Sequence, residues 1–168
     1  MKMTGAPRGW DVDAARCVNT VTAADVFDHC DIIVLCLPNS TIVRDVLRDA
    51  RLCSGQIIID TTTGDPREMA ALGAELAEKG VNYLDATVSG SSAQLLQRDV
   101  LVMVGGDAAT FERCRDLFAK FARETAHVGP CGSGAKMKLV TNLVLGLNRA
   151  ALAEGLAFAE AIGVSPAA

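Results

Sequence analysis

The chain has 168 residues, half of them apolar, which is enough for one buried core or slightly more. Its formal net charge of −4 and its scattered Lys and Arg residues argue against a nucleic-acid partner, because phosphate binding needs a concentrated positive field. The N-terminus lacks the apolar core of a secretory signal, and no apolar run is long enough to span a bilayer. We therefore expect a cytoplasmic protein with no membrane partner.

The six cysteines form neither a metal-binding nor a disulfide pattern. They occur singly, without a Cys-x-x-Cys pair, and only His29 and His127 could complete a metal site. Isolated cysteines with apolar neighbours are usually small core residues in a reducing compartment. We therefore expect no metal ion.

Short apolar runs alternate with amphipathic segments along most of the chain. The apolar runs predict buried strands at residues 32–37, 57–59, 83–86 and 100–104. Apolar residues at helical spacing predict helices at residues 42–51, 66–79 and 108–121. A strand–helix alternation with continuously apolar strands predicts an α/β fold, in which helices cover both faces of a parallel sheet.

The clearest helix start lies at residues 65–68, which read D-P-R-E. Asp65 is an N-cap acceptor, Pro66 suits the first helical position, and Glu68 would complete a capping box. This start makes residues 61–64 a tight loop at the carboxyl end of a strand. Open α/β sheets bind their ligands at that edge.

A long helix is predicted from about residue 135 to residue 162. It has apolar or small residues on nearly every side, so we expect it to be buried all round, and its charged residues argue against a membrane span. Such a helix needs packing partners, which makes a homo-oligomer plausible. Both ends of the chain look cut, because residues 165–166 (Ser-Pro) are a helix-start signal and residues 4–9 contain no strand followed by GxGxxG.

Two strand ends carry polar groups suited to a ligand. Leu37, Pro38 and Asn39 end the first clear strand, and residues 61–63 end the next. Their amide and hydroxyl groups could bond a ribose or a nicotinamide carboxamide. Ordinary strand-end turns remain the simpler interpretation of these residues alone.

Residues 85–92 form a second feature, a strand that ends in a hydroxyl-rich segment containing glycine. Backbone N–H groups in such a loop could hold a carboxylate. A flexible surface loop is an equally good interpretation of these residues without further context.

The third feature is a glycine-rich segment, residues 129–134, followed by a helix that begins near Ser133. Lys138 and Asn142 are four residues apart and share one side of this helix, whereas Lys136 points elsewhere. Apolar neighbours and the positive helix end both lower the pKa of Lys138, so it could transfer a proton near neutral pH. A solvated lysine on an amphipathic helix is the alternative.

In order and spacing, these features resemble the β-hydroxyacid dehydrogenase family from about Val12 onward. Residues 85–90 (D-A-T-V-S-G) resemble the family's D-A-P-V-S-G substrate motif, and residues 102–106 (V-M-V-G-G) resemble the strand and turn that follow it. The G-A-K-M-K form of residues 134–138 is similar to that of glyoxylate/succinic semialdehyde reductases.

The resemblance implies NAD or NADP as cofactor and a small hydroxyacid or semialdehyde acid, carrying a carboxylate, as substrate. Lys138 would be the catalytic acid and base, and Asn142 would hydrogen-bond the same substrate end. The residues implied to bind the substrate carboxylate are Ser89, Gly90 and Ser91. The residues implied to contact the dinucleotide are Leu37, Pro38, Asn39 and Thr63.

The resemblance also implies an incomplete Rossmann-like, doubly wound sheet in residues 1–130, and the start of an all-helical C-terminal domain in residues 131–168. The family's first strand, GxGxxG turn, first helix and second strand have no counterpart. Residues 32–37 would then be a bare, aggregation-prone sheet edge, and the expected strand at residues 16–18 would lack a neighbour. Thr87 replaces the family's proline, and Arg98 replaces its usual glycine.

Three functions remain in competition. The preferred hypothesis is a hydride-transfer enzyme represented by a truncated chain. The second is a non-catalytic dehydrogenase-like module that associates through the long helix, and the third is an unrelated α/β domain with chance motifs. The presence of both Lys138 and Asn142 favours the first.

Overall fold

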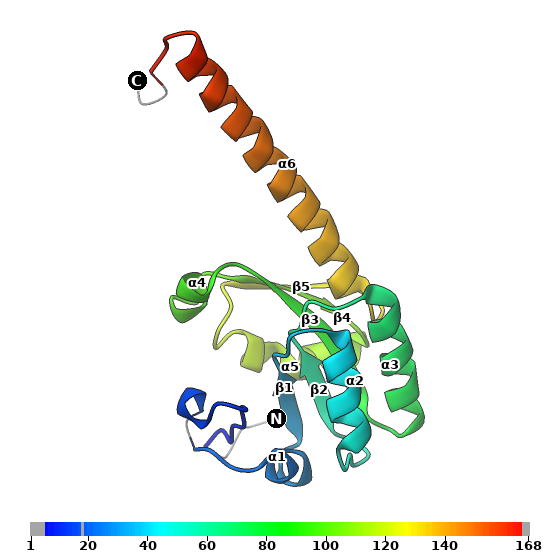
Figure 1. Ribbon diagram of the computed structural model, residues 1–168. Helices are drawn as coiled ribbons and strands as arrows, with labels where there is room; N and C mark the ends of the chain where they lie inside the picture. Colours follow the sequence, from blue (N-terminus) through cyan, green and yellow to red (C-terminus); the bar gives the residue numbers. More distant parts are fainter. Residues whose placement is uncertain (1–5, 18, 166–168) are drawn as a thin grey trace.

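The computed structural model describes residues 6–17 and 19–165, so the expectations that involve residues 4–5, Val18 and Pro166 lie outside the described residues. A five-stranded sheet is flanked by helices (Figure 1). Its strands, which are hydrogen-bonded in chain order, are β1 (Ile32–Leu35), β2 (Ile57–Asp60), β3 (Asn82–Ser89), β4 (Leu101–Gly105) and β5 (Glu124–Gly129). The helices are the short 3-10 helix η1 (Ala14–Arg16) and α1 (Ala23–His29), α2 (Ser40–Asp49), α3 (Pro66–Glu78), α4 (Ser92–Leu96), α5 (Ala108–Phe118) and α6 (Ser133–Ala161).

The sheet is mostly parallel. β1, β2 and β3 are parallel to one another, and β5 is parallel to β4, but β4 is antiparallel to β3. The expected α/β fold is confirmed, and the expectation of an entirely parallel sheet is wrong at the β3–β4 pair. A parallel connection needs a crossover of about a dozen residues or more. Between Ser89 and Leu101 the chain forms only the five-residue helix α4 and turns, so it returns antiparallel.

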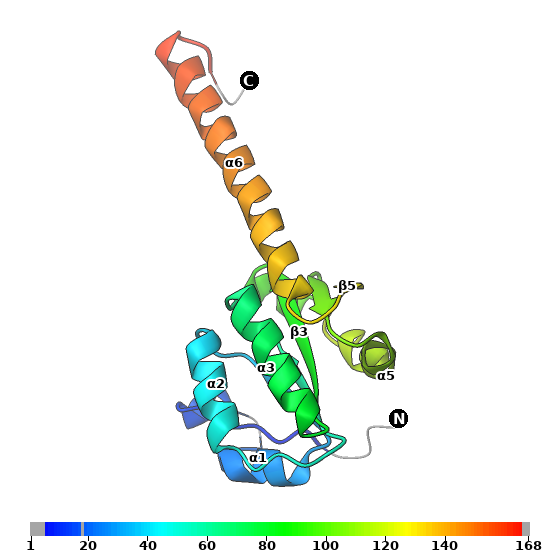
Figure 2. The same ribbon diagram turned by 90° about the vertical axis from the view of Figure 1, so that its right-hand side faces the viewer.

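Each face of the sheet has its own apolar core. Alternate strand residues point to opposite faces, so Ile58 packs with α2 and α3 while its neighbours Ile57 and Ile59 pack with α5. Figure 2 shows α2 and α3 on one side of β3 and α5 on the other. This arrangement explains why the central strands are continuously apolar in the sequence.

Four elements, η1, α1, α4 and β5, were not predicted, and the described part of one expected strand is wrong. Helices α1 and α4 are short, and β5 (E-T-A-H-V-G) lacks a continuous apolar run. Arg16 does not begin a strand but ends the 3-10 helix η1, whose first turn is capped by the carboxylate of Asp13. Gly9 and Thr20 form an isolated parallel bridge nearby.

Strand β1 forms an edge of the described sheet, as expected. It pairs with β2 alone, and the side chain of Val34 is 48% exposed on one face. Ile33 and Leu35 on the other face are buried. β1 is therefore a half-covered edge strand.

Helix α6 begins at Ser133, as predicted, but the described chain does not supply the packing partners that its expected burial requires. Within this helix only Gly134 and Ala135 are buried, and the remainder extends away from the sheet (Figure 1). Its apolar residues from Met137 onward therefore face solvent in this structure. Among the described residues, no helix combines the length and apolar character needed to cross a membrane.

The start of α3 differs in one bond from the predicted capping box. The Asp65 carboxylate accepts the N–H groups of Arg67 and Glu68, with Pro66 at the first position, as expected. The Glu68 side chain does not return to Asp65 but accepts the hydroxyl of Ser40, whose oxygen in turn accepts the Asp65 N–H at 3.4 Å. The cap therefore ties α3 to α2.

Arg98 occupies a left-handed turn after α4. Its φ is 58°, in the region that favours glycine. The Arg98 N–H donates to Leu95 at 3.0 Å and the Asp99 N–H donates to Gln94 at 2.8 Å, the pattern of a Schellman helix end. The departure from glycine thus leaves the turn intact and places an L-residue in a strained conformation.

We predict that Arg98→Gly raises the free energy of unfolding by up to about 1 kcal/mol. Relief of roughly 1–2 kcal/mol of left-handed strain is partly offset by the greater freedom of glycine in the unfolded chain. Urea denaturation measures the change. Arg113→Gly, the same substitution on the exposed side of α5, should instead lower stability by about 1 kcal/mol. A stability loss at position 98 would contradict the prediction.

Candidate active site

The start of α6 is fixed to the sheet by the carboxylate of Asp85, in the middle of β3. This side chain is completely buried, and its two oxygens accept the N–H groups of Gly132 at 2.8 Å and Ala135 at 2.9 Å. Burial raises the pKa of the Asp85 carboxyl, while these backbone N–H groups act to lower it. A negative group also suits the positive end of a helix. Asp85 therefore determines where α6 begins.

Two glycines let α6 lie directly on the strands. A Cβ atom at Gly134 would come within 2.6 Å of the Met103 carbonyl oxygen, and one at Gly105 would lie 2.9 Å from the Gly134 nitrogen. Such contacts are too short for any side chain. The close approach in this part of the site therefore requires glycine.

Lys138 lies on the side of α6 that packs against β3. Asp85, Thr87 and Ser89 are alternate residues of β3, so their side chains lie on the same face of the sheet. Thr87 contacts α6 from this face, because its hydroxyl donates to the Gly134 carbonyl at 2.9 Å. Lys138 lies one helical turn after Gly134 and therefore on the same side of α6. The lysine is half-buried, and this burial lowers the pKa of its amine, as the sequence predicted.

The other predicted helix residues are more exposed. Asn142 is exposed one turn beyond Lys138 on the same side of α6. Lys136 is also exposed, and its position two residues from Lys138 turns it to another side. The structure thus distinguishes the two lysines by burial.

The predicted substrate segment is partly strand rather than loop. Residues up to Ser89 pair with β4, so β3 continues to Ser89, which is half-buried. Gly90 then turns the chain with a φ of 146°. Ser91 caps α4, since its oxygen accepts the Gln94 N–H at 3.3 Å and its own N–H donates to the Gln94 side chain at 2.9 Å. Ser91 therefore has a structural role that the sequence did not predict.

The predicted dinucleotide residues lie at the carboxyl ends of β1 and β2. The Leu37 N–H donates to the Thr62 hydroxyl oxygen at 3.0 Å, which ties the two loops together. Pro38 and Thr63 are exposed beside them. The side-chain oxygen of Asn39 accepts the N–H of Ile42 at 3.0 Å and caps α2, so its amide nitrogen is the group that remains for a ligand.

These residues fit one end of a dinucleotide better than the other. The exposed groups of Asn39 and Thr63 suit a ribose or carboxamide, which forms neutral hydrogen bonds. A pyrophosphate instead needs open N–H groups at a helix start. Within the described residues, every α-helix start already has a side-chain acceptor, from Thr22, Asn39, Asp65, Asp85, Ser91 or Asp107.

A buried carboxyl that the sequence interpretation missed supports both loops. The Tyr83 hydroxyl donates to Asp60 at 2.6 Å, and the second Asp60 oxygen accepts the Thr62 N–H at 2.9 Å. Burial raises the pKa of Asp60 and of Tyr83. Asp60 and Asp85 are register partners on adjacent strands. The available signal was an acidic residue directly after one apolar run, Asp60, and within another, Asp85, because a carboxyl buried in a strand requires hydrogen-bond partners.

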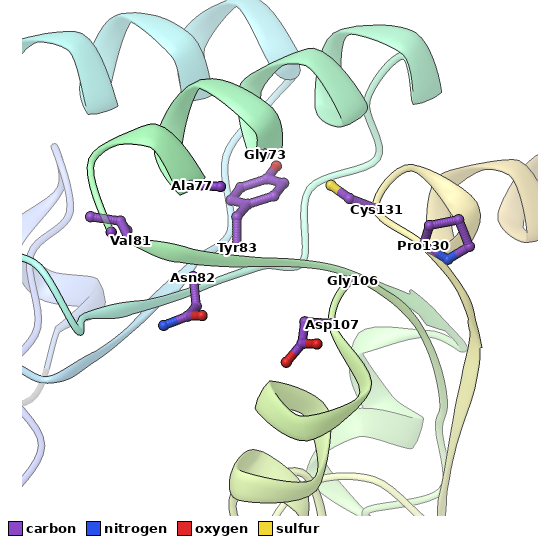
Figure 3. Close-up of a pocket in the computed structure, with 10 residues that line it drawn as sticks. Gly73, Ala77, Val81, Asn82, Tyr83, Gly106, Asp107, Pro130 and Cys131 are labelled. Carbon is purple, nitrogen blue, oxygen red and sulfur yellow. The ribbon is translucent and has the colours of Figure 1, made fainter.

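A hollow lined by residues of α3, β3 and the loop before α6 lies beside these hydrogen bonds. It measures about 370 Å³ and lies where α3, the start of β3, the turn after β4 and the loop before α6 meet. Figure 3 shows Tyr83 and Cys131 on the α3 side of β3 and Asp107 on the opposite side. Burial raises the pKa of the Cys131 thiol to about 12, so the thiol is protonated and a poor nucleophile at neutral pH.

Comparisons with known proteins agree with this architecture. Residues 10–129 match the family model described as the NAD binding domain of 6-phosphogluconate dehydrogenase. The 2-(hydroxymethyl)glutarate dehydrogenase of Eubacterium barkeri is 34% identical over 141 residues, which cover 81% of this chain and 47% of the relative. The 2-hydroxy-3-oxopropionate reductase of Escherichia coli is 33% identical over 154 residues, which cover 89% and 53%.

A solved structure shows the same fold. The 3-hydroxyisobutyrate dehydrogenase of Mycobacterium tuberculosis, solved with L-serine, has a TM-score of 0.85 at 29% identity, over 91% of this chain and 54% of that one. The fold is thus that of a dinucleotide-binding dehydrogenase domain. The chain belongs to the β-hydroxyacid dehydrogenase family. It spans about half the length of the curated relatives it matches.

We predict that Asp85→Asn lowers the free energy of unfolding by about 1–3 kcal/mol, because the amide NH₂ would face a backbone N–H and leave it unpaired in the interior. Thermal or urea denaturation measures the loss. Asp65→Asn is the matched control, since asparagine caps an exposed helix start nearly as well, and its effect should stay within about 0.5 kcal/mol. Equal stabilities of the two variants would argue against the docking role of Asp85.

Proposed function

We propose that this chain provides the substrate-binding strand end and the proton-transfer lysine of an NAD(P)-dependent β-hydroxyacid dehydrogenase. The observation that supports this most directly is the half-buried Lys138, on the side of α6 that faces β3. In this proposal residues 1–130 belong to the dinucleotide-binding domain, and residues 131–168 begin the helical domain.

In this proposal Lys138 of α6 transfers the proton, and residues at the end of β3 bind the substrate. The Lys138 ammonium donates a proton to the substrate carbonyl oxygen in reduction, and the neutral amine removes the hydroxyl proton in oxidation. Asn142, on the same side of α6, hydrogen-bonds the same end of the substrate. Ser89 and Gly90 bind the substrate carboxylate, and Ser91 contributes if its N–H leaves Gln94.

Leu37, Pro38, Asn39 and Thr63 contact the ribose and nicotinamide in this proposal. A bound nicotinamide supplies the hydride chemistry, while the protein contributes position and proton transfer. The names of the relatives, 2-(hydroxymethyl)glutarate dehydrogenase and 2-hydroxy-3-oxopropionate reductase, support a small carboxylate-bearing hydroxyacid or semialdehyde as substrate. NAD and NADP are both compatible with these residues.

The proposal includes a cytoplasmic location, supported by the scattered use of cysteine, and partners that are small molecules rather than nucleic acids or membranes. The exposed apolar residues of α6 support a homo-oligomer.

A non-catalytic module is the competing function, and the lack of a GxGxxG helix start among the described residues is the observation that favours it. The coding DNA around this segment distinguishes the two. An in-frame strand–GxGxxG–helix upstream supports the enzyme, because this unit supplies the open helix start that a pyrophosphate needs. An uninterrupted reading frame without such a unit supports the module.

We predict that Lys138→Ala lowers turnover about 10²- to 10⁴-fold in a dehydrogenase chain that contains this segment, with little change in cofactor affinity. Steady-state rates, followed by nicotinamide absorbance with small hydroxyacids, measure the loss. Lys136→Ala removes the same charge from an exposed position two residues away and should change turnover only slightly. Similar losses in both variants would refute the assignment.

The pH dependence provides a second readout of the same residue. Because the pKa of Lys138 is lowered, the protonated form is lost at a lower pH than for a solvated lysine. Reduction should therefore slow, and oxidation accelerate, as the pH rises through this lowered pKa. If the rates of reduction and oxidation both rose or both fell with pH in this range, the role of Lys138 as acid and base would be contradicted.

We predict that the 168-residue chain binds NADH or NADPH more weakly than micromolar, because its described residues contain no GxGxxG turn at the start of a helix to hold the pyrophosphate. Fluorescence titration or calorimetry tests this, with a dehydrogenase that contains a GxGxxG loop as the positive control. Micromolar binding would overturn this prediction.

A further inference from the structure

Thr87 is a buried hydroxyl at the contact between β3 and α6. Its side chain is completely buried, and its Oγ1 lies 2.9 Å from the Gly134 carbonyl oxygen and 3.4 Å from the Met103 carbonyl oxygen. A buried hydroxyl is costly unless it is hydrogen-bonded. The shorter bond goes to the helix, so Thr87 links the sheet to α6.

The acceptor of this bond is also part of the backbone that carries Lys138. In an α-helix the N–H of each residue donates to the carbonyl four residues earlier, so the Lys138 N–H donates to Gly134. One carbonyl thus joins the Thr87 side chain to the Lys138 backbone. The helix can lie close enough for this bond because position 134 has no side chain.

The hydrogen bond between Thr87 and Gly134 also relates the position of Lys138 on α6 to that of Ser89 on β3. Two residues along β3 advance about 6.6 Å, from Thr87 to Ser89, and both side chains share the face toward α6. Four residues along α6 advance about 6 Å, from Gly134 to Lys138, on one side of the helix. Ser89 and Lys138 therefore lie at similar distances beyond the Thr87–Gly134 hydrogen bond, one along β3 and the other along α6.

Asp85 alone does not fix the direction of α6. Its carboxylate holds N–H groups at the first turn, which is a single attachment at the end of a long helix. The bond from Thr87 adds a second attachment, on a carbonyl that points toward the next turn. Two attachments at different positions along β3 restrict the tilt of the helix.

We propose that Thr87 is a positioning residue for Lys138, because its hydroxyl bond to Gly134 sets the tilt of α6 that brings the amine to the strand end containing Ser89. The inference rests on the proposed function of Lys138 and adds a specific residue that acts through it. Thr87 itself touches neither the substrate nor the cofactor in this scheme.

The test uses the 168-residue chain and two readouts that report on Lys138. Thr87→Val removes the donor and nearly keeps the volume, whereas Thr87→Ser keeps the donor. NMR titration of the amine, assigned with Lys138→Arg, should show its pKa rising toward the ordinary lysine value in Thr87→Val, because the amine becomes more hydrated. The Lys138 amide should exchange about five- to tenfold faster, and Thr87→Ser should resemble the unmodified protein in both readouts.

A stability-matched control separates positioning from general weakening. Ile59→Val removes a methylene group from the core on the opposite face, under α5, and should leave both readouts unchanged. Thr87→Ala provides a second donor-free variant if Thr87→Val does not fold. A folded donor-free variant with an unaltered Lys138 pKa and amide exchange overturns the inference.

Separate experiments test the catalytic role of Lys138 and the positioning role of Thr87. Unchanged turnover in Lys138→Ala would remove the proposed function, whatever the NMR readouts of the Thr87 variants. An unaltered Lys138 in the Thr87 variants would remove only the positioning role and would leave the acid and base assignment in place.

Discussion

The contact between the Asp85 carboxylate and the first turn of α6 is the interaction on which the site depends. It places a charged group in the interior, where burial is unfavourable, and offsets this with two backbone donors and the positive end of a 29-residue helix. Without this contact, the first turn of α6 would be held to β3 mainly by the hydroxyl bond from Thr87 to the Gly134 carbonyl.

The site combines residues that are far apart in the sequence. Asp85 and Thr87 are separated from their partners in α6 by 47 to 50 residues. The intervening β4, α5 and β5 return the chain to the same place, and glycines at positions 105 and 134 allow close contact there. These buried hydrogen bonds hold the first turn of α6, and with it the backbone that carries Lys138, against β3.

The sequence predicted the features that local physics determines. The apolar runs located β1 to β4, and the Asp-Pro pair located the start of α3, since each depends on neighbouring residues alone. The position of Lys138 in the second turn of α6 and the lowering of its pKa by burial also followed from its neighbours. The roles assigned to the individual site residues remain predictions.

Other features depend on contacts that no local pattern specifies. The antiparallel direction of β4 follows from a short connection, and β5 has too few apolar residues to resemble a strand. The exposure of α6 reflects the absence of a packing surface among the described residues rather than its own composition. The partners of Asp60 and Asp85 required knowledge of the strand register.

The hydrogen bonds from Tyr83 through Asp60 and Thr62 to Leu37 have a dynamic consequence. They connect β3 to the two loops that follow β1 and β2, and each bond except the last is buried. We therefore expect displacements of these two loops to be coupled to each other and to β3, the strand that contacts α6. A molecule bound against one loop would thus also restrict the motion of the other loop at this edge of the sheet.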